Sequence, residues 1–120
     1  MEKYVPKYFS ENEFNRIGCS SSDCNPDSLK RLDALRELLG KPIVLNSAYR
    51  TVYSEKDHGR TGTSAHCLGR AFDIKCSNSS YRYDLVKCAL SVGFHRIGIG
   101  ERFVHVDDSP IHSPNVIWLY

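Results

Sequence analysis

Segment 64–74 (SAHCLGRAFDI) carries a histidine and an aspartate in positions that could bind a metal ion. It ends in an expected strand, and strand alternation puts Asp73 on the face opposite its apolar neighbours. A lone carboxylate in that environment is costly, so Asp73 needs a partner. Gly69 permits a tight turn that folds His66 back towards Asp73. This segment therefore predicts a polar pair beside a strand.

The second segment, 103–107 (FVHVD), is an expected strand in which His105 and Asp107 share one face. Two histidines and one carboxylate on strand faces match a catalytic zinc site, where three protein ligands leave one position for water. His66, Asp73 and His105 are the candidate zinc ligands. From spacing alone two other interpretations stay open: Asp73 caps the end of its strand, and His105 is a hydrogen-bonded core histidine.

Two helices are expected to support these segments. The first covers 26–39, where Asn25 caps the start and Gly40 ends the helix. Its leucines form one apolar stripe, and its charged residues are expected to face water. The second runs from about 81 to 92 and is capped by Ser79 or Ser80.

The remaining segments are short. A helical turn is expected near Ser10–Glu13, and residues 51–63 form a polar surface loop. Strands are expected at 42–45, 71–74, 96–99, 103–106 and 116–119. Together these elements predict one α+β domain over residues 1–120, a small, mostly antiparallel sheet with packed helices.

The composition excludes several classes of protein. The net charge is +2 without a Lys/Arg run, so no nucleic-acid partner is expected. No stretch reaches the roughly 20 apolar residues of a membrane span, and the N-terminal segment lacks the apolar region of a signal peptide. The odd number of cysteines, five, favours reduced thiols over disulfides. Cys19 and Cys24 have the spacing of a zinc pair, but no second cysteine pair completes that site.

At the two segments described first, the sequence resembles a known family. Ser64-x-His66-x-x-Gly69-x-Ala71-x-Asp73 is similar to the S-x-H-x-x-G-x-A-x-D motif of the zinc D-Ala-D-Ala carboxypeptidases and L-alanyl-D-glutamate endopeptidases. These enzymes share the hedgehog-like metallopeptidase fold. Segment 103–107 resembles the F-[IV]-H-V-D motif of the family's short, often phage-encoded branch. The resemblance extends from about Tyr8 to Tyr120.

The resemblance implies that His66, Asp73 and His105 bind Zn²⁺ and that Ser64 supports the loop. Segment 47–51 (SAYRT) resembles the family's S-[GA]-x-R motif, whose arginine lies in the active site. Arg50 is therefore expected to bind a substrate carboxylate or a developing oxyanion.

The general base is where the sequence departs from its relatives. Many relatives have a glutamate three residues before the last histidine, or a histidine two before it. Here Arg102 and Phe103 occupy those positions. Asp107, on the face of His105, is the first candidate for proton transfer, and His95 is the second.

We therefore expect a zinc metallopeptidase that hydrolyses peptidoglycan stem peptides, as a D-Ala-D-Ala carboxypeptidase or an L-Ala-D-Glu endopeptidase. The alternatives are a zinc-binding wall-recognition module of a phage or prophage that cleaves slowly or not at all, and a phage structural component. Without a signal peptide, the expectation is synthesis in the cytoplasm and action at the cell wall after lysis or other export. The sequence leaves the oligomeric state open, with a monomer as the expectation.

Overall fold

A computed structural model describes residues 3–120, and its elements confirm the α+β class. The expectation of one domain over residues 1–120 stays a prediction, and residues 1 and 2 lie outside the described part. The helices are α1 (Glu11–Arg16), α2 (Pro26–Leu39), α3 (Val52–Asp57) and α4 (Ser79–Ser91), with short 3₁₀ turns η1 (Ser21–Asp23) and η2 (Ala65–Leu68). The strands are β1 (Leu45–Ser47), β2 (Ala71–Lys75), β3 (Arg96–Ile99), β4 (Phe103–Asp107) and β5 (Val116–Leu119).

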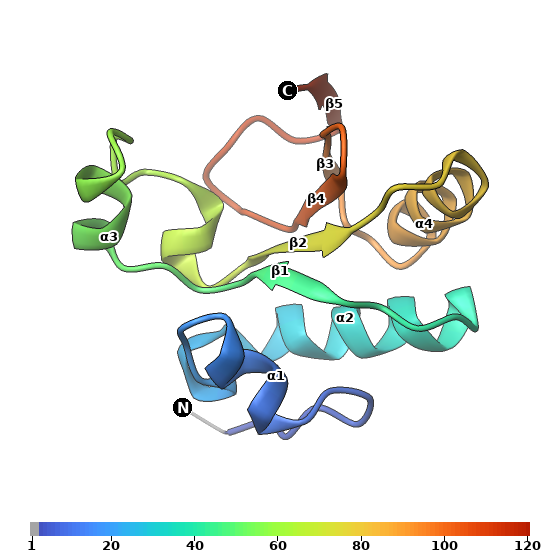
Figure 1. Cartoon of the computed structure of the whole chain (residues 1–120), viewed down its shortest axis with the longest axis horizontal. Coiled ribbons are helices and arrows are strands. Elements are labelled where there is room, and N and C mark those ends of the chain that lie inside the picture. Colours follow the sequence, from blue (N-terminus) through green and yellow to red (C-terminus); the bar gives the residue numbers. More distant parts are fainter. Residues whose placement is uncertain (1–2) are drawn as a thin grey trace.

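The five strands form one sheet in the order β1-β2-β4-β3-β5 (Figure 1). All neighbouring strands are antiparallel except β3 and β5, which are parallel. The sheet is thus mostly antiparallel, as the sequence predicts. Strands β2 and β4, which carry the two chemical segments, are neighbours near its centre.

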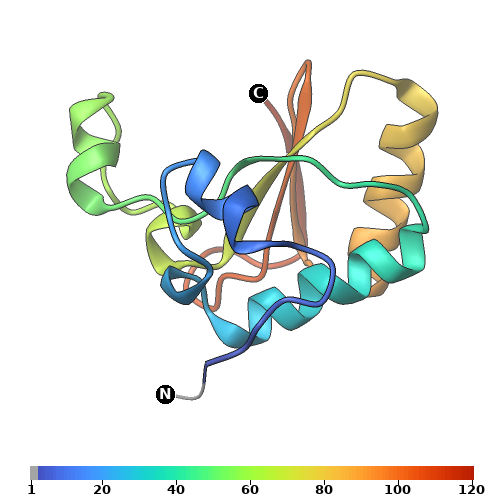
Figure 2. The ribbon, with the colours of Figure 1, turned by 60° about the horizontal axis from the view of Figure 1, so that its bottom comes forward.

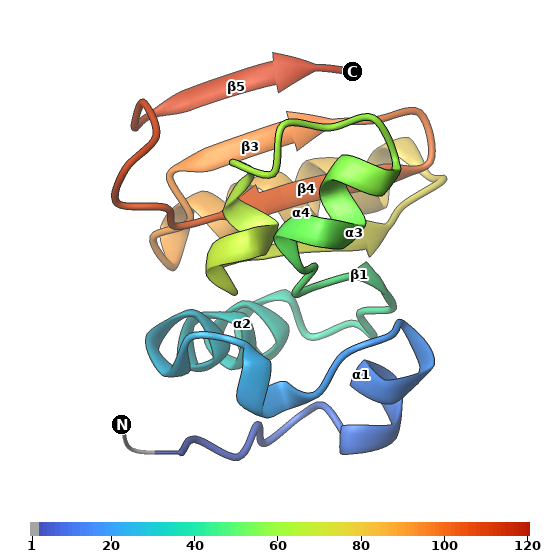
Figure 3. The same ribbon diagram turned by 90° about the vertical axis from the view of Figure 1, so that its left-hand side faces the viewer.

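Helices cover the two faces of the sheet differently. In Figure 3, α3 lies in front of the sheet and α4 behind it, while Figure 2 shows α2 and α4 together on one side. The apolar side chains of the strands are completely buried in the core on the side of α2 and α4: Phe72, Ile74, Ile97, Val104 and Val106. The alternate residues of β2 and β4 therefore face the other way, towards α3.

The predicted start and end of α2 are confirmed. The Asn25 side chain accepts hydrogen bonds from the backbone N–H groups of Asp27 and Ser28, and Gly40 ends the helix in the left-handed conformation. The capping box of α1 is also present. In α4 the capping side chain is that of Asn78, one residue before the expected serines.

Several expectations about local structure were wrong. The first strand lies at Leu45–Ser47 and not at 42–45. The segment expected to be a loop contains α3, with Thr51 as its cap. In α2, Leu38 is exposed, and Asp33 is buried rather than facing water. Asp33 accepts hydrogen bonds from the Tyr4 hydroxyl and from two backbone N–H groups, so it fastens the N-terminal segment to α2.

All five cysteines are unpaired in the structure, and their reduced state stays a prediction. None of the helices in residues 3–120 combines the length and apolar character that crossing a membrane requires.

Candidate metal centre

Strand pairing brings Asp73 and His105 together. In the antiparallel register of β2 and β4, Asp73 lies directly opposite His105. The Nδ1 atom of His105 lies 3.0 Å from Oδ1 of Asp73. The alternation predicted from the sequence is thus confirmed, because both side chains project from the face opposite the core.

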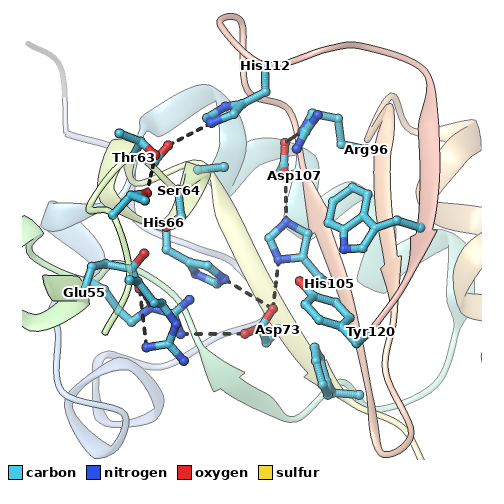
Figure 4. A pocket seen from close by; sticks show the side chains of 16 residues that line it. Glu55, Thr63, Ser64, His66, Asp73, Arg96, His105, Asp107, His112 and Tyr120 are labelled. Carbon is cyan, nitrogen blue, oxygen red and sulfur yellow. Dashed lines mark hydrogen bonds and ion pairs between the residues drawn. The ribbon is translucent and has the colours of Figure 1, made fainter. Parts of the chain in front are cut away.

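A glycine turn brings His66 to the same point. η2 carries His66 and ends at Gly69, whose φ of +70° lies in the left-handed region. A Cβ on Gly69 would approach the Asp23 carbonyl oxygen to 2.6 Å, so this turn also packs too closely for another residue. The Nε2 atom of His66 lies 3.3 Å from Oδ1 of Asp73. Figure 4 shows the three side chains pointing towards one another.

The separations of the two imidazole nitrogens from the Asp73 carboxylate fit a zinc ion. One ligand atom from each of His66, Asp73 and His105 lies within 4.8 Å of the others. Ligands about 2.0–2.1 Å from a tetrahedral zinc are about 3.3–3.4 Å apart. The 3.0 and 3.3 Å separations around Asp73 match that spacing. The donor set, two imidazoles and a carboxylate, is typical of a catalytic zinc site.

Outer partners fix which nitrogen of each histidine faces the site. His66 donates its Nδ1–H to the carbonyl oxygen of Ala48 at 2.6 Å, which leaves Nε2 for a metal. His105 donates its Nε2–H to Oδ2 of Asp107, also at 2.6 Å, which directs Nδ1 towards Asp73. Each ligand histidine is thus held in one tautomer by its partner.

Asp107 is fully buried, and both of its oxygens are engaged. Oδ2 accepts from His105, while Oδ1 lies 2.9 Å from Nε of Arg96 and accepts the Ser109 N–H at 3.1 Å. Ala71 lies opposite Asp107 in β2. The carboxylate thus connects β4, β3 and the loop after β4.

The electrostatics favour a charged site. Burial raises the pKa of Asp73, but His105 and His66, which donate to it when their inner nitrogens also carry a proton, outweigh burial and hold that pKa well below its usual range. Burial lowers the pKa of His105, and the hydrogen bonds to Asp107 and Asp73 raise it more, so the net shift is upward. Burial also raises the pKa of Asp107, while its hydrogen bond to His105 lowers it below the ordinary value. The cluster therefore favours a positive charge beside the Asp73 carboxylate.

Arg50 adds a positive charge beside the three ligands. Its Nη1 atom lies 3.8 Å from Oδ2 of Asp73 and donates to Ser47 Oγ at 2.8 Å. Its Nε atom lies 2.8 Å from Oε2 of Glu55, a carboxylate of α3. Arg50 thus lies beside the three candidate ligands.

The three ligands line a cavity of about 530 Å³ that has a cationic side and an aromatic side. Arg50 and Arg60 lie on the cationic side, and the aromatic side consists of Phe103, Trp118 and Tyr120. Gly98 lies under two of these rings, where a Cβ would come within 2.6 to 2.8 Å of ring atoms. The absence of a side chain at Gly98 therefore lets the aromatic rings rest against β3.

The two candidates for proton transfer have different positions. Asp107 lines the cavity next to His105. His95 is not among the lining residues in the part of the chain that the structure describes, and its Nε2–H donates to the Ser109 carbonyl oxygen at 3.1 Å. His95 thus supports the loop after β4 at some remove from the metal ligands.

The cavity-lining residues that sequence reasoning missed include Glu55, His112, Trp118 and Tyr120. His112 bridges two loops, since Nδ1 accepts from the Ser109 hydroxyl and Nε2–H donates to the Thr63 carbonyl oxygen. Strand alternation offered a signal for the two aromatic residues, which are two positions apart and so share a face. Glu55 and His112 lie in segments without periodicity, which gave no such signal.

Comparison with known proteins agrees with the geometry. A family model described as Peptidase M15 matches residues 7–107, which is most of the chain and includes all three candidate ligands. A search of curated proteins finds no match. The chain therefore belongs to the Peptidase M15 family, the zinc D-Ala-D-Ala carboxypeptidase-like peptidases.

Proposed function

We propose that this protein is a zinc metallopeptidase that hydrolyses peptidoglycan stem peptides, at the D-Ala-D-Ala or the L-Ala-D-Glu bond. The convergence of His66, Asp73 and His105 on one point of a lined cavity supports this proposal most directly. Membership of the M15 peptidases supports a peptide as the substrate. Action at the cell wall after lysis or other export is part of the same proposal.

The roles of the residues follow from their contacts. His66, Asp73 and His105 hold the metal, which when bound acidifies water and polarises a carbonyl group. Arg50 binds an anionic group of the substrate and so aligns the peptide bond with the metal. Asp107 keeps His105 in the tautomer that binds metal, and we assign it this positioning role in place of the proton transfer expected from the sequence.

Digestion of purified muropeptides followed by mass spectrometry tests the proposal. The wild-type protein loaded with zinc is expected to release fragments whose masses identify the bond. His66→Ala is expected to lose zinc and cleavage together, because one of three protein ligands is removed. His58→Ala is a matched control, since His58 is exposed on the C-terminal cap of α3 and outside the cavity lining. Unchanged hydrolysis by His66→Ala would refute the assignment.

One observation favours a second candidate, a zinc-binding wall-recognition module without hydrolysis. Within residues 3–120 the carboxylates that line the cavity are Glu55, Asp73 and Asp107, and each contacts a histidine or an arginine. None of the three is a free general base. Stoichiometric zinc with intact muropeptides in the same digest would favour the module.

A further inference from the structure

Helix α3 packs on the rest of the protein through a carboxylate. Glu55 is its buried residue, with 0% of its surface exposed, while the apolar Val52 and Tyr53 on the same helix are 47% and 81% exposed. Amphipathic helices normally bury apolar side chains and expose charges. The position of α3 therefore depends on the ionic contacts of Glu55 more than on the hydrophobic core.

Those contacts are with two arginines of the cavity. Oε2 of Glu55 lies 2.8 Å from Nε of Arg50 and 3.7 Å from Nη1 of Arg60. A buried carboxylate is tolerated only when it is paired, and here one anion faces two cations. The neighbouring Arg60 is half exposed, whereas the Arg50 side chain is 24% exposed. Arg50 is therefore the closer and more buried partner of the two.

Arg50 is held from several directions. Its backbone N–H donates to the His66 carbonyl oxygen, and its Nη1 atom is shared between Ser47 and Asp73. On the other edge of the guanidinium, Nε forms an ion pair with Glu55. Within the described part of the chain Nη2 has no hydrogen-bond or ion-pair partner, so a donor stays available for a ligand. The planar group is thus fixed in position before a substrate arrives.

We propose that Glu55 is a positioning residue, which holds the Arg50 guanidinium beside the metal centre so that it can receive a carboxylate group of the substrate. The inference rests on the proposed function, because it assigns a partner to the arginine of that site. It gives α3 a role in substrate binding. Proton transfer by Glu55 is the competing assignment.

The surroundings of Glu55 argue against proton transfer. Burial raises the pKa of Glu55, but the neighbouring Ser64 hydroxyl and the charges of Arg50 and Arg60 lower it below the ordinary value. A carboxylate that two arginines stabilise in its charged form is a weak base. Glu55 borders the cavity, but both of its carboxylate oxygens are buried, whereas a general base must contact the reacting groups.

Glu55→Gln and Asp57→Asn form a matched pair of variants on α3. Each removes one negative charge and keeps the volume, but Asp57 is exposed and outside the cavity lining. With a stem pentapeptide as substrate, Glu55→Gln is expected to raise KM about tenfold or more with little change in kcat, since a binding contact weakens. Asp57→Asn is expected to match the wild type. A loss of kcat at unchanged KM would overturn the proposal in favour of proton transfer.

The substrate carboxylate supplies a second test. Amidation of the C-terminal carboxylate of acetyl-D-Ala-D-Ala is expected to weaken its binding to the zinc-loaded wild type, measured by calorimetry, and to matter much less for Glu55→Gln. Binding of the free acid that is equal in both proteins would overturn the proposal, as would the absence of binding to the wild type. This measurement needs no turnover, so it separates a failure of this inference from a failure of the proposed hydrolysis.

A double-mutant cycle distinguishes positioning from a general structural role. If Glu55 acts through Arg50, then Arg50→Lys and the double variant with Glu55→Gln bind the free acid equally weakly. Additive losses would contradict the proposal. Circular dichroism and zinc stoichiometry check the fold. If Glu55→Gln does not fold, Glu55→Asp serves instead, because it keeps the charge but lengthens the contact with Arg50, and affinity equal to the wild type would then overturn the proposal.

Discussion

Asp107→Asn is expected to weaken zinc binding about 10- to 100-fold, which corresponds to about 1.4–2.7 kcal/mol. The wild-type carboxylate is engaged on both sides: Oδ2 accepts from His105, while Oδ1 accepts from the Ser109 N–H and forms an ion pair with Arg96. An amide has one oxygen and one NH₂ group, so it can satisfy one side alone. The substitution therefore preserves size but not the pattern of hydrogen bonds.

Each orientation of the new amide has a cost. With the oxygen towards Arg96, the NH₂ group faces Nε2 of His105 and favours the tautomer that carries its proton on Nδ1, the nitrogen that should bind metal. With the oxygen towards His105, the NH₂ group faces the Arg96 guanidinium and the Ser109 N–H, and buried donors are left unpaired. The first orientation weakens the metal site, and the second destabilises the loop after β4.

Zinc affinity can be measured by competition with a chromophoric chelator at neutral pH. Asp84→Asn is a suitable control, since Asp84 pairs with Lys41 on the surface of α4 and is not among the residues that line the cavity. The control is expected to keep the wild-type affinity, and Asp73→Asn to lose most of it. If Asp107→Asn binds zinc as tightly as the wild type but no longer cleaves peptides, the positioning role is wrong and the proton-transfer role expected from the sequence is favoured.

Three further predictions concern stability and pH. Because the pKa of Glu55 lies below its ordinary value of 4.5, its ion pairs stabilise the fold fully above that pH, and the stability difference between the wild type and Glu55→Gln should shrink as pH falls below it; a constant difference in urea unfolding down to about pH 3 would contradict this. Gly98→Ala should lower the unfolding free energy by about 1–3 kcal/mol, because its Cβ meets the Trp118 ring at 2.7 Å; an unchanged melting temperature would show that the ring moves freely. Asp33→Ala should cost about 1–3 kcal/mol in urea unfolding and return the pKa of Tyr4, raised to about 12 by its hydrogen bond to Asp33, towards 10 in an NMR titration; a Tyr4 pKa that stays near 12 would contradict the role given to that hydrogen bond.

The central part of the site could be predicted from the sequence because it depends on local rules. Strand alternation predicts that Asp73 and His105 each project from the face of their strand that lies opposite the apolar core residues. Gly69 marks the turn that returns His66 to them. A centre built from two regular strands and one glycine turn is therefore accessible to reasoning about periodicity.

The parts that were missed depend on pairing between distant charges. α3 is six residues long and has no apolar stripe, so nothing local distinguishes it from a loop. Glu55 is buried beside its two ion-pair partners, Arg50 and Arg60. Asp33 is buried because the N-terminal segment folds over it. A hydrophobicity pattern predicts that charged residues at such positions face the solvent. Their burial is a property of the tertiary structure.

The separation of the sheet into an apolar face and a metal-binding face has a consequence for how the protein is made. The buried side chains that hold α2 and α4 to the sheet lie on one side of the strands, and the three candidate ligand side chains lie on the other. We therefore expect the apolar layer to supply most of the free energy of folding and the proposed metal little of it, unlike small zinc domains that unfold without their ion. We expect the polypeptide to reach its native structure while empty, so that delivery of the chain and acquisition of zinc can occur in different places and at different times.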